Sequence, residues 1–534
     1  MKIIKANNII LIFTYFFLIA TSINTNAQSN MPIQWQACFG GTDRDNVIDM
    51  VTTDNGYLLI GTIFSDDGDI TNSHGGKDIW IVKIDSIGNM LWEKAFGGSE
   101  DDYARRIVRN NDGDYYFVAE VGSNDGDIQS GNHGAFDIWV VKIDGMGELI
   151  WEKCYGGSGY DDYPNLKLLS DGNLLITCNS SSSNGDVPTN YGFYDAWVFI
   201  ISPDGEILKN TVFGNNLQNE QPVAIETQDG SFFLTTYTSS TNGMVEGTYH
   251  GGMGDVWALK LDTDLSIEWQ MLYGGSGFDG GSKPIIEFAD GYIFLASTDS
   301  YDGDVSGFHG GFKDIWVVRI DLEGNIIWQR CLGGSANDYS RVLRQTEDGG
   351  FIVVGNTSSN NGDVSGNHSY PNGWTDIWKV KLSNNGELEW QQCYGGLADE
   401  TVYSGVIKKS DHNWVIAGSS EYNSFDVNCN MHGEDDFWVF EIKDTTTNII
   451  DNQIDDHEIK VYPNPAREYV VFELNEYPNN VEIQIVNVFG QEEEMITVKQ
   501  EKTVWDTRKV KAGIYFYNVE IDRKVLSGKI AVQN

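Results

Sequence analysis

The feature that most constrains the fold of this chain is a tripeptide, Asp-x-Trp, that recurs seven times at nearly constant spacing. Its tryptophans are Trp80, Trp139, Trp197, Trp257, Trp316, Trp378 and Trp438. Successive copies lie 58 to 62 residues apart, and a period of this kind is typical of architectures that repeat one supersecondary unit. The sequence therefore predicts seven similar units.

Each unit contains four segments with the composition of β-strands. In the second unit these segments are 104–109, 115–121, 137–143 and 149–154, rich in β-branched and aromatic residues and bounded by Asn, Asp and Gly. The pair Asp112-Gly113 between the first two segments predicts a tight hairpin turn. Four-stranded antiparallel units repeated radially form a β-propeller. We therefore predict an all-β protein with a seven-bladed β-propeller over residues 28–444.

The two ends of the repeat region complement each other. The seventh unit ends at residues 436–443 without the Trp-containing fourth strand, whereas a strand of that type, 33–38, precedes the first unit. We expect this N-terminal strand to complete the seventh blade and close the propeller. Pairing of this kind removes two exposed sheet edges, which are otherwise sites of aggregation.

Outside the repeats, three segments have different compositions. Residues 1–27 combine two lysines, a 12-residue apolar run and a small-residue cleavage site, which predicts a secretory signal peptide. Residues 445–458 are polar and are interpreted as a linker. Residues 459–534 show alternating apolar segments without the 60-residue period, which predicts a small β-sandwich.

Two resemblances follow from these motifs. Residues 33–444 resemble a bacterial β-propeller repeat family whose units run Gly-Gly-x-x-x-Asp, Asp-Gly-x-x-Tyr-x-x-Gly and Asp-x-Trp/Phe-Val-x-Lys. Residues 459–534 resemble the type A C-terminal sorting domain of type IX secretion substrates, an Ig-like β-sandwich. The residues that carry the second resemblance are Tyr462, Pro463, Asn464, Pro465, Gly490, Gly513, Tyr515 and Lys529. It implies the secretion and sorting machinery as a partner and a secreted or cell-surface location.

The charge of the chain restricts its partners. With 35 Lys+Arg and 78 Asp+Glu, the formal charge is −43. An anionic surface repels the phosphate backbone, so we expect no nucleic-acid partner. The apolar run in residues 1–27 is shorter than the roughly 20 residues that a spanning helix needs, and no later stretch is uniformly apolar. We therefore expect no transmembrane segment.

The repeat separates scaffold residues from functional candidates, because a residue that the fold requires recurs in most units. The recurring tryptophans are interpreted as a core between blades. One position of the fourth strand holds Cys38, Cys154, Cys331 and Cys393, and Ala95, Val212 and Leu272 stand there in other units. Exchange with apolar residues favours buried thiols over disulfides.

The long loops before the third strands and after the fourth strands are expected on one face, which is strongly acidic. Its Asp-Gly-Asp sequences supply Asp67, Asp69, Asp125, Asp127, Asp302 and Asp304. These residues are typical of turns that cap their own backbone, and they are also candidate ligands for calcium, the one cofactor that the sequence suggests. Six histidines, with Tyr191 in the third unit, recur in the same loops and are interpreted as structural.

Departures from the repeat indicate a binding surface. The sixth unit inserts residues that include Tyr370 and Trp374. Neighbouring loops add the aromatic residues Tyr191, Tyr194, Phe308 and Phe312. Rings beside carboxylates suit sugars, since a ring stacks on pyranose C–H groups while the acids bind hydroxyls, although packing within the loops is the alternative. The leading hypothesis is therefore a binding module for a glycan or an extracellular protein.

Two other hypotheses stay open. One is a glycan hydrolase or lyase that uses acidic residues of this face, and the other is a structural surface protein stabilised by calcium. No nucleophile, zinc or nucleotide motif stands in a fitting context, and no particular carboxylate pair is indicated, so the sequence favours a protein without catalysis.

Overall fold

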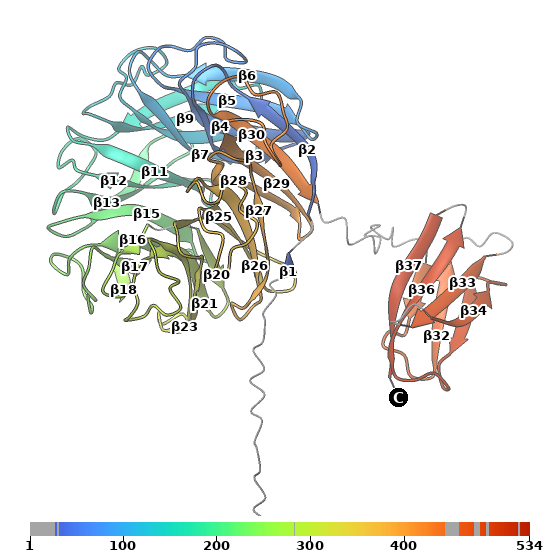
Figure 1. Ribbon diagram of the computed structural model, residues 1–534. Helices are drawn as coiled ribbons and strands as arrows, with labels where there is room; N and C mark the ends of the chain where they lie inside the picture. Colours follow the sequence, from blue (N-terminus) through green and yellow to red (C-terminus); the bar gives the residue numbers. More distant parts are fainter. Residues whose placement is uncertain are drawn as a thin grey trace, which may run out of the picture. The chain divides into compact units, whose positions relative to one another are not determined.

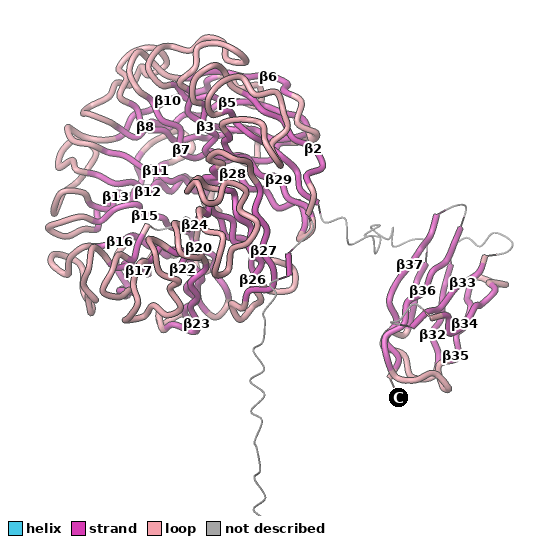
Figure 2. The backbone as a smooth tube through the Cα atoms, viewed as in Figure 1, coloured by secondary structure: helices cyan, strands magenta, loops and turns pink. Residues whose placement is uncertain are grey.

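The computed structural model of the protein describes residues 27–28, 31–281, 284–443, 459–474, 481–487, 491–521 and 524–533. Two compact units are present, one containing Ile33–Ile442 and the other Lys443–Asn534. Strands are the regular elements of both units (Figure 2). Within the described ranges, no helix has the length and apolar character to cross a membrane. The expected signal peptide, apart from Ala27, and the expected linker lie outside the described residues.

The described strands of the larger unit form seven sheets, each built mainly from strands that follow one another along the chain. The first three sheets are β3 (Asp45–Thr53), β4 (Gly56–Ile63), β5 (Asp78–Asp85) and β6 (Met90–Phe96); β7 (Asp102–Arg109), β8 (Tyr115–Val121), β9 (Asp137–Ile143) and β10 (Leu149–Tyr155); and β11 (Asp161–Leu168), β12 (Leu174–Ser180), β13 (Asp195–Ile201) and β14 (Ile207–Phe213). These bounds agree closely with the strands expected for the second unit of the sequence.

The fourth to sixth sheets repeat this pattern with small departures. They are β15 (Asn219–Glu226), β16 (Phe232–Thr238), β17 (Asp255–Leu261) and β18 (Ile267–Tyr273); β19 (Asp279–Gly280), β20 (Ile285–Phe288), β21 (Gly291–Thr298), β22 (Asp314–Ile320) and β23 (Ile326–Leu332); and β24 (Asp338–Gln345), β25 (Phe351–Thr357), β26 (Asp376–Leu382) and β27 (Leu388–Tyr394). β1 (Ala27–Gln28) adds to the sixth sheet by pairing in parallel with β27.

The seventh sheet joins the two ends of the repeat region. It contains β28 (Thr401–Ser410), β29 (Asn413–Ser420), β30 (Asp436–Lys443) and, from the start of the chain, β2 (Ile33–Phe39). β2 pairs antiparallel with β30, with Cys38 opposite Trp438. Figure 1 shows the blue strand β2 beside the orange strand β30. The N-terminal strand thus takes the place of the missing fourth strand.

The first and seventh sheets also contact each other directly. The backbone N–H of Val47 in β3 donates to Oγ of Ser419 in β29, at 3.2 Å. The rings of Trp80 and Phe437 pack edge to face with 5.0 Å between their centroids. The same apolar cluster contains residues of both sheets. Sheets that are farthest apart in the sequence are therefore packed as neighbours.

The recurring tryptophans of the third strands lie in apolar clusters shared by neighbouring sheets, as Trp139 does with Leu58 and Ile81 of the preceding sheet. The seven are fully buried. Each indole N–H donates to a side chain of the fourth strand, one residue after the position of the recurring tryptophan of that strand. Trp139 donates to Glu152 at 2.7 Å, and Trp316 donates to Gln329 at 2.8 Å. In the seventh sheet the acceptor of Trp438 is Gln36 of β2, at 2.9 Å. A buried indole N–H needs such a partner, which explains why an acid or amide recurs there.

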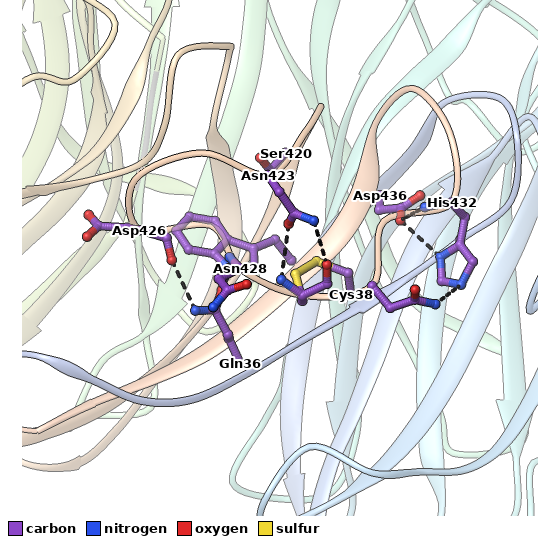
Figure 3. Close-up of a disulfide and its surroundings, with 12 residues drawn as sticks. Gln36, Cys38, Ser420, Asn423, Asp426, Asn428, His432 and Asp436 are labelled. Atoms are coloured by element: carbon purple, nitrogen blue, oxygen red, sulfur yellow. Dashed lines mark hydrogen bonds and ion pairs between the residues drawn. A yellow bond between two sulfur atoms is a disulfide. The ribbon is translucent and has the colours of Figure 1, made fainter.

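The prediction that Cys38 is a free thiol is wrong. Cys38 forms a disulfide with Cys429, while Cys154, Cys178, Cys331 and Cys393 are free and buried. Cys429 lies in the loop between β29 and β30, and Asn423 holds its backbone by accepting from its N–H and donating to its carbonyl (Figure 3). Comparison between repeats missed this bond because Cys429 has no counterpart in the other units.

The smaller unit is made of two sheets. One contains β31 (Ile459–Tyr462), β32 (Tyr469–Leu474) and β35 (Lys502–Asp506), and the other β34 (Glu492–Thr497), β33 (Glu482–Asn487), β36 (Gly513–Ile521) and β37 (Lys524–Val532). Phe472 of the first sheet packs edge to face on Tyr517 of the second within one buried apolar cluster. Two sheets that share a core in this way form a β-sandwich.

Candidate functional site

The acidic loops of the larger unit bind the glycine-rich turns that precede them in the chain. In the second unit, Asp125 accepts a hydrogen bond from the N–H of Ser99 at 2.7 Å, and Asp127 accepts one from the N–H of Gly97 at 3.2 Å. The Oγ of Ser123 accepts a third from the N–H of Glu100 at 2.9 Å. The Asp-Gly-Asp sequence is thus a clasp for the turn between β6 and β7.

The other candidate calcium ligands have the same partners. Asp67 and Asp69 accept from the N–H groups of Thr42 and Gly40, and Asp302 and Asp304 accept from those of Ser276 and Gly274. These amide bonds lower the pKa of Asp125 and of Asp302. In the part of the chain that the structure describes, no group of three or more His, Cys, Asp or Glu side chains is placed to hold a metal ion. The structure thus places the six residues in three separate clasps, two in each.

The histidines of these loops link one unit to the next. The ring of His309 shares a hydrogen bond through Nδ1 with Asp314 of its own unit, at 2.6 Å, and its Nε2 lies 3.5 Å from Asp363 of the following unit. Equivalent contacts to the next unit join His74 to Asp127, His250 to Asp304, His368 to Asp426 and His432 to Asp69. The hydrogen bonds with Asp314 and Asp376 raise the pKa of His309 and of His368. The histidines therefore have structural partners, and the last one reaches the first unit.

A layer of buried carboxyl groups stands at the start of the first strands. Asp338 accepts from the N–H of Gly334 and from the hydroxyl of Ser359, and Glu400 accepts from Gly396 and Ser420. Burial raises the pKa of Asp338 to about 7 and that of Glu400 to about 8. Both side chains are fully buried. These carboxyls hold protons near neutral pH, but a substrate does not reach them.

The aromatic candidates lie on three separate units. Tyr191, Phe312, Tyr370 and Trp374 are exposed, with 46% of Trp374 accessible to solvent. Phe308 is half-buried and packs edge to face on Tyr301 of its own loop, and Tyr194 is half-buried. The exposed rings provide apolar surface beside the polar groups of these loops.

The inserted loop of the sixth unit is internally hydrogen-bonded. The side-chain oxygen of Asn367 accepts from the N–H groups of Ser369 and Tyr370, at 2.9 and 3.0 Å. The hydroxyl of Ser369 donates to the carbonyl of Trp374 at 2.8 Å. The loop therefore holds the backbone of Trp374 while its ring remains exposed, an arrangement that lowers the entropy cost of binding.

A cavity of about 460 Å³ lies among the first strands of the units, and it was not predicted from the sequence. Every unit contributes to its wall: Ile48, Arg105, Leu166, Val223, Ile285, Val342 and Tyr403. Its charged lining groups are Arg105, Arg106, Lys167, Arg341, Arg344 and Asp49. The basic residues of β7 and β24 are visible in the sequence as 104–109 and 340–344, but the register that turns them inward is not.

The structure brings together two distant parts of the sorting motif in the smaller unit. The Nδ2 of Asn464 donates to the carbonyl of Lys529 at 2.8 Å, and its Oδ1 accepts from the N–H of Ala531 at 2.9 Å. The peptide bonds before Pro463 and Pro465 are cis. Tyr515 is buried and donates to the carbonyl of Lys511. Gly513 begins β36, and Gly490 lies outside the described residues.

Comparison with known proteins assigns the smaller unit. Residues 460–533 match the family described as the secretion system C-terminal sorting domain. This domain marks the chain for export by type IX secretion, to the cell surface or the medium.

Comparison of the rest of the chain is less specific. The regulatory protein FlaEY of Caulobacter vibrioides is 22% identical over 370 residues, which are 58% of this chain and 38% of that protein. The chain thus spans less than half the length of this curated relative.

Solved structures with similarity include BBS1N in complex with ARL6DN, at 9% identity and a TM-score of 0.42 over 79% of this chain and 99% of that one. The GH93 alpha-L-arabinofuranosidase of Fusarium graminearum has 13% identity and a TM-score of 0.38, over 63% and 92% of the two chains. The polysaccharide lyase Uly1 has 9% identity and a TM-score of 0.41, over 74% and 89%. Similarities of this size do not define a function for this chain.

Proposed function

We propose that the protein is an exported seven-bladed β-propeller, occupying residues 28–444, that binds an extracellular glycan or protein without catalysing a reaction on it. The sorting domain at 459–534 delivers the propeller and the linker at 445–458 joins them. The face formed by the loops before the third strands is the binding surface. The ring of seven blades is supported by the β2–β30 pairing and by the contacts between the first and seventh sheets.

One observation carries the binding proposal. On the loop face, the Asp side chains that recur from unit to unit are engaged in hydrogen bonds with the scaffold, whereas the inserted loop of the sixth unit presents two exposed aromatic side chains, Tyr370 and Trp374. Trp374 is the largest of them and its loop is held by Asn367. An exposed aromatic ring on an ordered loop is typical of a contact that a partner buries.

The absence of a reaction is part of the proposal. Asp338 and Glu400, whose pKa values burial raises to about 7 and about 8, are fully buried, so they do not form an acid–base pair on this surface. Asp67, Asp69, Asp125, Asp127, Asp302 and Asp304 accept hydrogen bonds from backbone N–H groups, and the proposal therefore gives them a structural role in the turns.

The test is a glycan array with the chain from residue 28 onward, run with calcium and with chelator. Trp374→Ala is expected to lose the specific signals. Ile87→Ala, which removes an exposed apolar side chain from the turn between β5 and β6, is the matched control and should bind as the wild type does. Mass spectrometry of each bound glycan then distinguishes binding from cleavage. Equal binding by Trp374→Ala and wild type, or the appearance of products, contradicts the proposal.

A further inference from the structure

The central cavity carries a charge opposite to that of the protein. Its lining has five cationic side chains, Arg105, Arg106, Lys167, Arg341 and Arg344, and one carboxylate, Asp49. The whole chain has a formal charge of −43. Because a low-dielectric wall focuses the field of the charges that line it, the cavity forms a local positive potential within an anionic molecule.

The carboxylate in the cavity accepts hydrogen bonds from backbone N–H groups. Asp49 is buried and accepts from the N–H groups of Met50 and Ile107, at 2.9 and 3.2 Å. Arg106 donates to the carbonyl of Arg105 at 3.1 Å, and Arg344 donates to the carbonyls of Leu343 and Val406. The two guanidinium groups therefore have carbonyl partners that orient them and do not neutralise them.

Only one of the five cations has a close carboxylate. Arg105 pairs with Glu120 through Nε at 2.6 Å. Among the described residues, Arg106, Lys167, Arg341 and Arg344 have no carboxylate oxygen within 4 Å. Burial, together with the charge of the other cations, lowers the pKa of each of these four groups. The cavity thus concentrates five positive charges, which Asp49, Glu120 and Glu226 balance only in part.

Two tyrosine rings contact the guanidinium groups of Arg105 and Arg341. The guanidinium of Arg341 lies 4.8 Å from the ring centre of Tyr403, and that of Arg105 lies 4.3 Å from the ring centre of Tyr163. Tyr163 has a φ of 51°, which is rare for a bulky residue, and its N–H donates to Glu120, the partner of Arg105. The Nε of Arg341 is buried without a hydrogen-bond partner. This N–H is therefore available to donate to an acceptor on a ligand.

We propose that this cavity is a binding site for a small multivalent anion, one that carries two or more carboxylate, sulfate or phosphate groups, with Arg106, Lys167, Arg341 and Arg344 as its ligand-binding residues. A volume of about 460 Å³ is in the range of small-molecule sites. Guanidinium groups bind such oxyanions with charge-assisted hydrogen bonds. The site is separate from the loop face, so this proposal stands or falls independently of the proposed function.

The first experiment is isothermal titration calorimetry of the chain from residue 28 onward. The probes are trigalacturonate, a trisulfated heparin disaccharide, inositol hexakisphosphate and, as the neutral control, maltotriose. At least one anionic probe is expected to bind, with an affinity that falls as salt is added, and the probe preferred tells carboxylate, sulfate and phosphate apart. Absence of binding by all three anions, or equal binding of maltotriose, overturns the proposal.

Substitutions of the cations and of Asp49 are expected to change the affinity for the anionic probes in opposite directions. Arg106→Gln and Arg344→Gln are each expected to weaken binding about tenfold, because each removes a charge-assisted contact. Asp49→Asn keeps an acceptor for the backbone but removes the negative charge, and it should strengthen binding about threefold. Arg44→Gln is the matched control, since Arg44 is exposed and pairs with Glu434 and Asp435. It should bind as the wild type does.

Folding is checked by near-ultraviolet circular dichroism, and Arg341→Lys supplies a variant that keeps the charge. This variant should retain binding within about threefold while Arg341→Gln loses it, because the positive charge of the side chain contributes most to the binding of an anion. Trp374→Ala should not change the affinity of the anionic probes. Weaker binding by Asp49→Asn, or unchanged binding by both Arg106→Gln and Arg344→Gln, contradicts the proposed site.

Discussion

The loop face and the central cavity of the larger unit use charged residues in different ways. On the loop face, the same Asp and His side chains return in successive units, and each is bonded to the scaffold, as Asp127 is to Gly97 and His74. In the cavity, Arg106, Lys167 and Arg344 have no basic counterpart at the same position in most other units. The side chains that recur on the loop face thus serve the fold, whereas the cavity cations that most units lack are available for a function.

The largest change in stability is expected for a tryptophan that recurs in every unit. Trp316→Ala removes a fully buried ring and its hydrogen bond to Gln329, and we expect it to lower the free energy of unfolding by about 4 kcal/mol. Trp374→Ala removes an exposed ring that occurs once, and the expected change is below about 0.5 kcal/mol. Urea unfolding followed by tryptophan fluorescence measures both. Similar losses in the two variants would break the distinction.

A second effect concerns one position that differs between units. Cys38 and Cys331 occupy equivalent sites in their strands, but only Cys38 has a disulfide partner, Cys429. We expect Cys38→Ser to lower the free energy of unfolding by about 3 kcal/mol, because the bond closes a very long loop in the unfolded chain. Cys331→Ser is the control. A reducing agent should shift the urea midpoint of Cys331→Ser and wild type, but leave that of Cys38→Ser unchanged.

The third prediction uses the buried carboxyl layer. Burial raises the pKa of Glu400 from 4.5 to about 8, so between these values the folded chain holds a proton that the unfolded chain has released. This contribution to stability is present below pH 4.5 and is lost as the pH rises through about 8. The raised pKa of His309 and His368 acts in the same direction, since stability from a protonated histidine is lost as the pH rises.

We therefore expect the melting temperature to be higher at pH 5 than at pH 8. Glu400→Gln should reduce the difference in the free energy of unfolding between the two pH values by about 3 kcal/mol, because the amide does not ionise. Glu323→Gln, at an exposed position, is the control and should keep the wild-type difference. If Glu400→Gln has the same dependence of stability on pH as the wild type, the raised pKa of Glu400 does not contribute to that dependence.

The sequence was a good guide wherever the fold repeats. The strands β8 and β9 have the predicted bounds, and the N-terminal strand pairs with β30 as expected. Each of these features follows from a pattern seen several times, so one ambiguous unit is corrected by the others. The sorting motif was also predicted, and the structure adds that Asn464 joins it to the last strand.

Features that occur once were harder to predict. Cys429 has no equivalent in other units, so nothing in the sequence paired it with Cys38. The arginines of the cavity lie in β7 and β24. The pairing of β7 with β8 shifts register between Ala104 and Arg106, and the pairing of β24 with β25 shifts between Ser340 and Val342. Such a bulge changes which side chains face inward, and alternation along the strand alone does not reveal it.

The pairing of β2 with β30 also sets the stage of synthesis at which the seventh sheet is able to form. β2 is synthesised first among the strands of the repeats, yet its partner follows only after six further units have been made. Contacts between such distant segments form late in folding, because the entropy of a long loop opposes them. The sorting domain at 460–533 follows β30 closely in the sequence. A chain cut short within the repeats would therefore lack both its final strand pairing and its export address, so that only finished molecules carry both.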